Sequence, residues 1–224
     1  MLIAVPLDDE RFTERVRKAK ALGADLIELR VDLFNDPSLP AVKKKLELVK
    51  KEGLGTILTV RAPEEGGREL PNRGELIREL GPLSDYTDLE LRRRSELVVY
   101  GPLIRQAGKK LIVSYHDFER TPPSWILKEL FREGKRYGGI PKVAVKANGL
   151  EDAARLLCVA REVPGEKIAI AMGQEGVVTR VAGFAFGSVI SYASLDKATA
   201  PGQLPLEELV RLRELFYGAA FKRA

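Results

Sequence analysis

The stretch RFTERVRKAKALGADLIELRV, residues 11–31, contains the unit from which we expect the fold to be built. Its first part, Arg11–Leu22, has the mixed apolar and charged pattern of an amphipathic helix, and Gly23 lies where such a helix would stop. Its second part, Asp25–Val31, is a short run rich in Leu, Ile and Val that favours a buried strand. A helix followed directly by a short apolar strand predicts an alternating α/β architecture.

The same alternation extends in both directions from this unit. The predicted strands are Leu2–Pro6, Asp25–Val31, Thr56–Arg61, Tyr86–Leu91, Lys110–Tyr115, Lys142–Lys146, Lys167–Met172 and Val189–Ala193. Predicted helices between and after them include Arg11–Leu22, Pro40–Lys51, Pro123–Arg136, Glu151–Arg161 and Pro205–Phe216. Eight strands in 224 residues leave about 28 residues for each strand–helix unit, which suffices for a (β/α)8 TIM barrel.

A doubly wound open sheet is the alternative α/β architecture. Its nucleotide-binding form needs a glycine-rich turn after the first strand, and here that turn is Pro6-Leu7-Asp8-Asp9-Glu10. No linker, low-complexity tract or change of composition marks a second domain. We therefore predict a single barrel domain over residues 1–224.

Composition limits the class of partner and the compartment. The chain has 37 basic and 32 acidic residues, net +5, and they are interleaved rather than gathered in one basic stripe, so we expect no nucleic-acid partner but a field that suits a small anionic substrate. No apolar run is long enough to span a bilayer. Cys158 is the only cysteine, which excludes an internal disulfide and a cysteine-based zinc cluster. With no leader pattern at its start, the chain is expected to be a soluble cytoplasmic protein.

The same counts indicate a protein from a hot habitat. The chain contains few thermolabile residues, three Asn, three Gln, two Met and one Cys, while 31% of its residues are charged.

Ionisable residues interrupt strands that should be apolar on both faces. They follow the period-two alternation of a strand, so each set shares one face. The sets are Glu28 with Arg30, Thr59 with Arg61, Asp88 with Glu90, Ser114 with His116, and Lys142 with Lys146. Buried charges are costly unless they are paired or catalytic, and the carboxyl ends of barrel strands are where chemistry takes place.

Each of these residues also has a purely structural interpretation. Glu28 and Arg30 are compatible with a buried ion pair, and a lone histidine such as His116 is more often a satisfied core residue. Lys146 is expected to extend to the rim. Lys142 is deeper, where burial and nearby cations favour the uncharged amine that attacks carbonyl carbons. Periodicity alone does not choose between the two lysines.

Two loops add candidate ligand contacts. After the third strand, Arg61-Ala62-Pro63-Glu64-Glu65-Gly66-Gly67 places paired glycines beside a carboxylate, which indicates a sharp bend near a ligand or an ordinary flexible turn. After the eighth strand, Lys197-Ala198-Thr199-Ala200-Pro201-Gly202-Gln203 is expected to overhang the mouth of the barrel as a lid.

Taken together, these segments resemble the type I 3-dehydroquinate dehydratases, Schiff-base enzymes of the shikimate pathway. The resemblance covers nearly the whole chain. It is carried, in order, by Glu28-Leu-Arg30-Val-Asp32, Arg61 with Glu65-Gly66-Gly67, His116-Asp117-Phe118, Ile140-Pro141-Lys142-Val-Ala-Val, Gly176-Val-Val-Thr-Arg180-Val-Ala-Gly183, Phe186-Gly187-Ser188 and Ala200-Pro201-Gly202-Gln203.

The resemblance implies a hydro-lyase that converts 3-dehydroquinate to 3-dehydroshikimate for aromatic amino acid and chorismate biosynthesis. It makes Lys142 the imine-forming lysine, His116 the general acid and base, and Glu65 the residue that orients His116. It implies that Arg180 binds the substrate carboxylate. The remaining substrate contacts that it implies are Glu28, Arg30, Arg61, Met172, Thr199 and Gln203.

The resemblance further implies an eight-stranded barrel that forms homodimers and needs no metal or organic cofactor. The chain departs from the family pattern at three places. Thr199 stands where serine is frequent and keeps its hydroxyl, whereas Pro6 loses one. Lys146-Ala147 replaces a methionine–proline pair, so an extra cation lies near the expected site.

Two other functions were compared with this one. A class I aldolase uses a barrel lysine in the same imine chemistry, but on sugar phosphates it needs a phosphate cradle, and the loop Met172-Gly173-Gln174-Glu175-Gly176 carries an acidic residue there. A non-catalytic barrel that serves as a binding or regulatory subunit would not need a lysine, a histidine and a glutamate that are directed at the same point.

Overall fold

The computed structural model describes residues 1–196 and 200–221 and contains one eight-stranded sheet of parallel strands. The strands are β1 (Leu2–Leu7), β2 (Leu26–Arg30), β3 (Gly55–Thr59), β4 (Tyr86–Glu90), β5 (Lys110–Asp117), β6 (Ile140–Lys146), β7 (Ile168–Met172) and β8 (Ile190–Tyr192). Each strand from β1 to β6 pairs with its successor in sequence, and β8 pairs with β1. A parallel bridge from Lys167 to Ser188 joins the β7 and β8 segments, so the sheet closes on itself.

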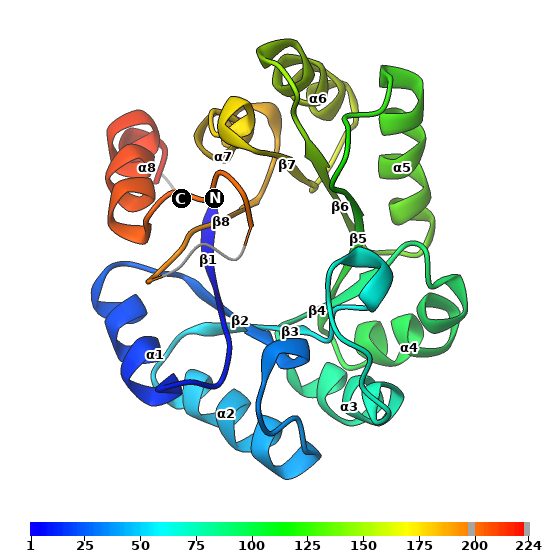
Figure 1. Cartoon of the computed structure of the whole chain (residues 1–224), viewed down its shortest axis with the longest axis vertical. Coiled ribbons are helices and arrows are strands. Elements are labelled where there is room, and N and C mark those ends of the chain that lie inside the picture. The colour runs from blue at the N-terminus through cyan, green and yellow to red at the C-terminus, as the bar shows by residue number, and fades with distance from the viewer. Residues whose placement is uncertain (197–199, 222–224) are drawn as a thin grey trace.

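The helices form a ring outside the strands, as Figure 1 shows. They are α1 (Phe12–Ala21), α2 (Leu39–Lys51), α3 (Arg73–Leu80), α4 (Arg94–Gln106), α5 (Ser124–Arg136), α6 (Leu150–Glu162), α7 (Thr179–Ala182) and α8 (Leu206–Phe221). This is the (β/α)8 barrel predicted from the sequence. No helix in the described ranges is long and apolar enough to cross a membrane.

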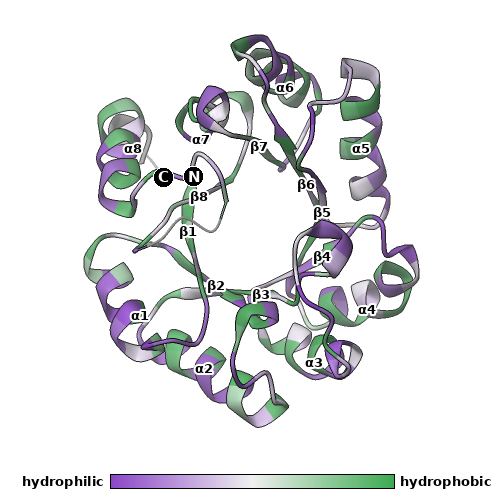
Figure 2. Cartoon of the chain, in the orientation of Figure 1, coloured by the Kyte–Doolittle hydropathy of each residue, from purple (hydrophilic) through white to green (hydrophobic). Residues whose placement is uncertain are grey.

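Local sequence explains where the elements start and stop. The first two helices are followed by Gly23 and Gly53, whose φ angles of +90° and +80° belong to the left-handed region that glycine adopts without strain. Along the outer helices, hydrophobic and hydrophilic residues alternate in Figure 2. The apolar stripes pack on the strands, for example through Val42, Leu46 and Val49 of α2.

The structure corrects several predicted boundaries, and two of them affect the site. β5 continues to Asp117, two residues beyond the predicted end, so His116 lies within the strand. β6 begins at Ile140, two residues earlier than predicted, so Lys142 is the third residue of its strand and not the first. The predicted strand left out Pro141, which pairs in parallel register with Val113 of β5.

The barrel interior changes character from one end to the other. Toward the amino ends of the strands it is apolar, with side chains such as Leu26, Ile57, Ile112, Ile168 and Ile190 in one buried cluster. Toward the carboxyl ends, the same inward alternation places buried polar side chains. These are Glu28, Thr59, Asp88, Glu90, Ser114 and Lys142. An apolar plug therefore supports a charged layer that faces the mouth.

Candidate active site

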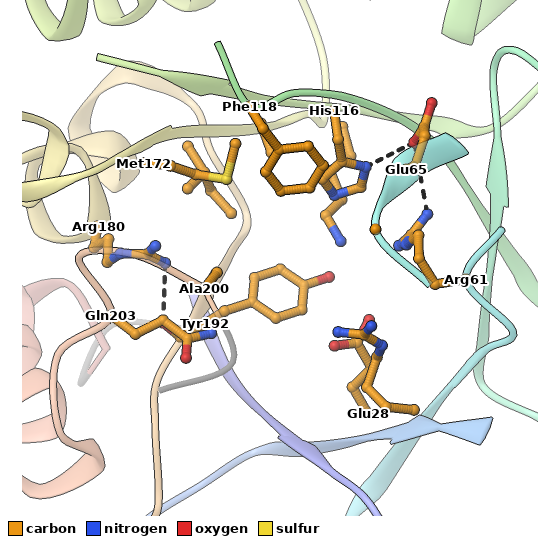
Figure 3. Close-up of a pocket in the computed structure, with 15 residues that line it drawn as sticks. Glu28, Arg61, Glu65, His116, Phe118, Met172, Arg180, Tyr192, Ala200 and Gln203 are labelled. Carbon is orange, nitrogen blue, oxygen red and sulfur yellow. Dashed lines mark hydrogen bonds and ion pairs between the residues drawn. The ribbon is translucent and has the colours of Figure 1, made fainter. Parts of the chain in front are cut away.

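A cavity opens at the carboxyl ends of the strands, and most of the predicted site residues line it. Its lining is Glu28, Arg30, Arg61, Glu65, Gly66, His116, Phe118, Lys142, Ala144, Ile170, Met172, Arg180, Tyr192, Ala200 and Gln203. These residues come from β2, β5, β6, β7 and β8, from the segments after β3, β5 and β8, and from α7. Figure 3 shows the labelled side chains converging on one space.

Lys142 lies at the floor of the cavity and is 5% exposed. Its Nζ lies 3.0 Å from Oδ2 of Asp88 and 4.3 Å from the centroid of the Tyr192 ring. The sequence argument expected an uncharged amine with cations around it. The structure places a carboxylate and an aromatic face against this nitrogen.

Asp88 belongs to a buried ion network centred on Arg61. The Arg61 guanidinium lies 3.0 Å from Oδ2 of Asp88 and 3.1 Å from Oε1 of Glu90, and it also donates to Oγ of Ser114. Burial alone would raise the pKa of Asp88, but Arg61 and Lys142 hold it below its usual range. A carboxylate with these partners stays ionised at any ordinary pH, so it is a permanent counter-ion for Lys142.

Arg61 has a larger structural role than its sequence position suggested. Beyond Asp88 and Ser114, it shares Glu90 with Arg73 of α3, whose guanidinium lies 2.6 Å from the second Glu90 oxygen. Glu90 also accepts the backbone N–H of Ala62. The network therefore joins β3, β4 and α3, and it leaves only part of the Arg61 guanidinium for a ligand.

His116 projects into the cavity from the end of β5 and is held by Glu65. Its Nδ1 lies 2.8 Å from Oε2 of Glu65, the contact drawn in Figure 3. Burial, followed by the charges of Arg61 and Lys142, lowers the pKa of His116 well below its usual value. Burial raises the pKa of Glu65 to about 8. The neutral imidazole therefore presents Nε2 to the cavity, since Nδ1 is engaged.

The loop after β3 explains how Glu65 reaches this position. Residues Pro63–Glu65 form a short 3-10 turn, and Gly66 follows with a φ of +84°. A Cβ at Gly67 would lie 1.9 Å from the carbonyl oxygen of Arg61. Both glycines are therefore required for this bend. Of the two interpretations of this segment, the structure shows the sharply bent backbone and not the ordinary flexible turn. Phe118 stacks on His116 from the other side, at 6.0 Å between ring centroids.

Arg180 lies across the cavity from Glu65. Its guanidinium donates to the backbone carbonyls of Gly202, Tyr192 and Pro201, at 2.6, 3.2 and 3.1 Å. Within the described ranges no carboxylate forms an ion pair with it, and burial lowers the pKa of Arg180 to about 10. A buried cation that has only neutral partners is suited to bind an anion.

The other predicted residues divide into three groups. Glu28, Met172 and Gln203 line the cavity, and Oε1 of Glu28 accepts the Thr59 hydroxyl at 2.7 Å. Arg30 also lines it but pairs with Asp32, at 2.7 Å, rather than with Glu28. Thr199 lies outside the described residues.

Lys146, the competing lysine, is not part of the cavity lining. In residues 1–196 and 200–221 no group of three or more His, Cys, Asp or Glu side chains is placed to hold a metal ion.

Sequence reasoning assigned no site role to two residues that shape the cavity, Asp88 and Tyr192. Asp88 carried a signal, because it interrupts an apolar strand, but periodicity did not show that it would meet Lys142. Tyr192 gave no signal, since tyrosine is an ordinary strand residue.

The chain is similar to known proteins over nearly its whole length. The family described as type I 3-dehydroquinase matches residues 3–219. A curated 3-dehydroquinate dehydratase from Aquifex aeolicus is 64% identical over 97% of this chain and 99% of its own, and one from a Hydrogenobaculum species is 49% identical over the same shares. The crystal structure of the A. aeolicus enzyme superposes with a TM-score of 0.95, covering 97% of this chain and all of that one.

A more distant solved structure has the same fold. The type I enzyme from Clostridium difficile, determined with covalently modified comenic acid, is 26% identical, covers 97% of this chain and 92% of its own, and has a TM-score of 0.88. From the length of the family match and the identity to curated relatives, we conclude that the chain belongs to the type I 3-dehydroquinase family.

Proposed function

We propose that the protein removes water from 3-dehydroquinate to give 3-dehydroshikimate through an imine on Lys142. The observation that carries the proposal is that one cavity contains a buried lysine, a histidine held by a carboxylate, and an arginine that has no acidic partner among the described residues. Family membership supports this reaction over the carbon–carbon cleavage of a class I aldolase.

In the first stage, the amine of Lys142 attacks the ketone carbon of the substrate, and water leaves to give a protonated imine. The positive charge then resides on the former amine nitrogen of Lys142, beside Asp88 and the Tyr192 ring. Asp88 and the ring of Tyr192 therefore stabilise the iminium without rearranging. The iminium withdraws electrons, which makes the proton on the neighbouring carbon more acidic.

In the second stage, Nε2 of His116 removes that proton and the electron pair forms an enamine. The enamine expels the β-hydroxyl group, and His116 returns the proton so that the group leaves as water. Hydrolysis of the imine by a second water frees the product and Lys142. Imine formation releases one water and imine hydrolysis consumes one. The net change is therefore the loss of the β-hydroxyl group of the substrate as one water.

Arg180 is proposed to bind the substrate carboxylate. Its guanidinium has five N–H groups in a plane; three donate to backbone carbonyls, and Figure 3 draws a further contact with Gln203. Glu28, Arg30, Arg61, Gln203 and Thr199 are proposed to contact the hydroxyls, and Met172 to form an apolar wall. The reaction as written uses only side chains of this chain, with no metal or organic cofactor.

The oligomeric state and the cellular compartment of the protein are proposals as well. We propose a homodimer in the cytoplasm, and light scattering of the purified protein distinguishes the dimer from a 24.8 kDa monomer.

The decisive experiment is borohydride reduction in the presence of 3-dehydroquinate, followed by peptide mass analysis. We expect a reduced adduct on Lys142, and formation of a conjugated enone that absorbs in the ultraviolet when borohydride is left out. In the His116→Ala variant we expect turnover to fall at least ~10²-fold while the adduct still forms. Labelling of Lys146 instead, or no adduct with turnover retained, would refute the imine on Lys142.

A further inference from the structure

One hydroxyl group faces the cavity without a partner. Tyr192, the last residue of β8, is 4% exposed, and within the described part of the chain its oxygen has no hydrogen bond. Figure 3 shows this hydroxyl directed into the space between His116, Arg61 and Glu28. Buried hydroxyls are nearly always hydrogen-bonded, so an unpartnered one that faces a cavity marks the position of a ligand group.

A structural role of the side chain accounts for the ring but not for the oxygen. The Tyr192 ring packs in the apolar cluster of the barrel interior with neighbours such as Ala4 and Ile190. A phenylalanine would fill that space equally well and would leave no polar atom buried without a partner. The unpaired hydroxyl therefore destabilises the free protein. A ligand that accepts its hydrogen bond would remove this destabilisation.

The position of Lys142 shows which part of the substrate the hydroxyl meets. Nζ lies over the Tyr192 ring, 4.3 Å from its centroid, and the hydroxyl is bonded to the edge of that ring. A substrate joined to Nζ through its ketone carbon must lie next to the ring, with the neighbouring atoms within reach of the hydroxyl. Burial, and after it the charge of Glu28, raises the pKa of Tyr192 well above its usual value, so the group is a neutral O–H donor.

We propose that the Tyr192 hydroxyl donates a hydrogen bond to a substrate oxygen on the carbon beside the one that Lys142 attacks. The inference rests on the proposed function and adds a residue that selects hydroxylated ketones. A ketone without an oxygen at that position would leave the tyrosine unpaired and so would bind less tightly.

The test is Tyr192→Phe, which removes the oxygen and keeps the ring. We expect KM for 3-dehydroquinate to rise about threefold to tenfold, the range for one neutral hydrogen bond, with kcat changed less than twofold. The unliganded variant should melt about 2–4 °C higher, because a buried unpaired hydroxyl is gone. The matched control is Tyr86→Phe, at the opposite end of the barrel beside Lys110, which should leave KM unchanged.

Trapping the imine with borohydride separates this inference from the proposed function. In the reduced adduct the wild-type hydroxyl has its partner, so the advantage of Tyr192→Phe in melting temperature should vanish or reverse. An unchanged KM, or a raised KM with a lowered melting temperature in the free variant, would overturn the inference while leaving the Lys142 adduct intact. Absence of the adduct in both proteins would instead refute the proposed function.

Discussion

The proton shared by Glu65 and His116 determines when the imidazole can act as a base. While Glu65 is protonated, its O–H donates to Nδ1 at 2.8 Å, so the ring proton must be on Nε2. Once Glu65 ionises, Nδ1–H donates to the carboxylate and Nε2 has a free lone pair toward the cavity. The tautomer that the proposed reaction needs therefore depends on ionisation of Glu65.

Turnover is accordingly expected to rise with pH up to the pKa of Glu65, which burial raises to about 8. Measuring kcat at saturating substrate between pH 6 and 9 checks this. In Glu65→Gln the rise should disappear and the remaining rate should be low. Glu64→Gln is the control, because Glu64 pairs with Arg93 outside the cavity. A wild-type profile that is flat through pH 8 would contradict the tautomer argument.

At the scale of the element, the segment from Arg61 to Gly67 converts a strand end into a catalytic position. It closes with the N–H groups of Glu65 and Gly67 both donating to the Ala62 carbonyl, at 3.0 and 2.9 Å. The bend brings Glu65 beneath His116 although the two residues are 51 positions apart. The position of the carboxylate is thus set by backbone geometry.

Gly67→Ala should therefore disable the site by moving this segment. Its new Cβ would lie 1.9 Å from the Arg61 carbonyl oxygen, which is backbone and cannot swing aside. We expect a loss of about 1–3 kcal/mol in the free energy of unfolding and a fall in kcat of ~10²-fold as Glu65 shifts. Gly218→Ala is the control: in α8 its Cβ meets no heavy atom within 4 Å, so stability should rise by about 0.5–1 kcal/mol. Wild-type activity in Gly67→Ala would reject this role for the loop.

The helices and strands also show how much of the fold the sequence pattern predicts. Period-two alternation and glycine stops predicted all eight strands, because they reflect local chemistry and burial on two faces. They did not predict that β5 runs through His116 or that Pro141 joins β6, because strand ends are set by pairing with a neighbour. Contacts between residues far apart in the sequence were not predicted either. Asp88 and Lys142 are 54 residues apart, and only the closure of the barrel brings their side chains to 3.0 Å. The roles of Lys142 and His116 came from family resemblance and not from periodicity.

For the molecule as a whole, the barrel exchanges stability for a prearranged site. Most of its charged layer is paired, through Asp88, Glu90 and Arg73, but several buried groups lack a full set of partners in the described part of the free protein. Three of them line the cavity, where a substrate would compensate them: Arg180 without an acidic partner, the Tyr192 hydroxyl, and Oε1 of Glu65, which has no hydrogen bond although Nε of Arg92 lies 3.3 Å away. Two further unpartnered atoms, one nitrogen of Arg73 and the Ser191 hydroxyl oxygen, lie outside the cavity lining, so only part of this cost is placed where a substrate can remove it.

The Glu65–His116 pair makes this cost visible as a pH dependence of folding. Burial raises the pKa of Glu65 to about 8 and lowers that of His116 well below its usual 6.5. Below pH 6.5 the folded pair holds one proton on Glu65 and the unfolded chain holds one on His116, so their effects offset. Between pH 6.5 and 8 only the folded pair holds a proton. Because the folded state binds more protons there, its stability falls as pH rises.

Over that interval the free energy of unfolding is expected to drop by roughly 2 kcal/mol, since each pH unit with one extra bound proton contributes about 1.4 kcal/mol. Chemical denaturation of the wild type at pH 6.5, 7.2 and 8 measures the slope. Glu65→Gln cannot release this proton, so its slope should be flat, whereas Glu64→Gln should keep the wild-type slope because arginine pairing lowers the pKa of Glu64 to about 2. If Glu65→Gln declined as the wild type does, another group would hold the proton, and the pH dependence of turnover would lose its assignment to this pair.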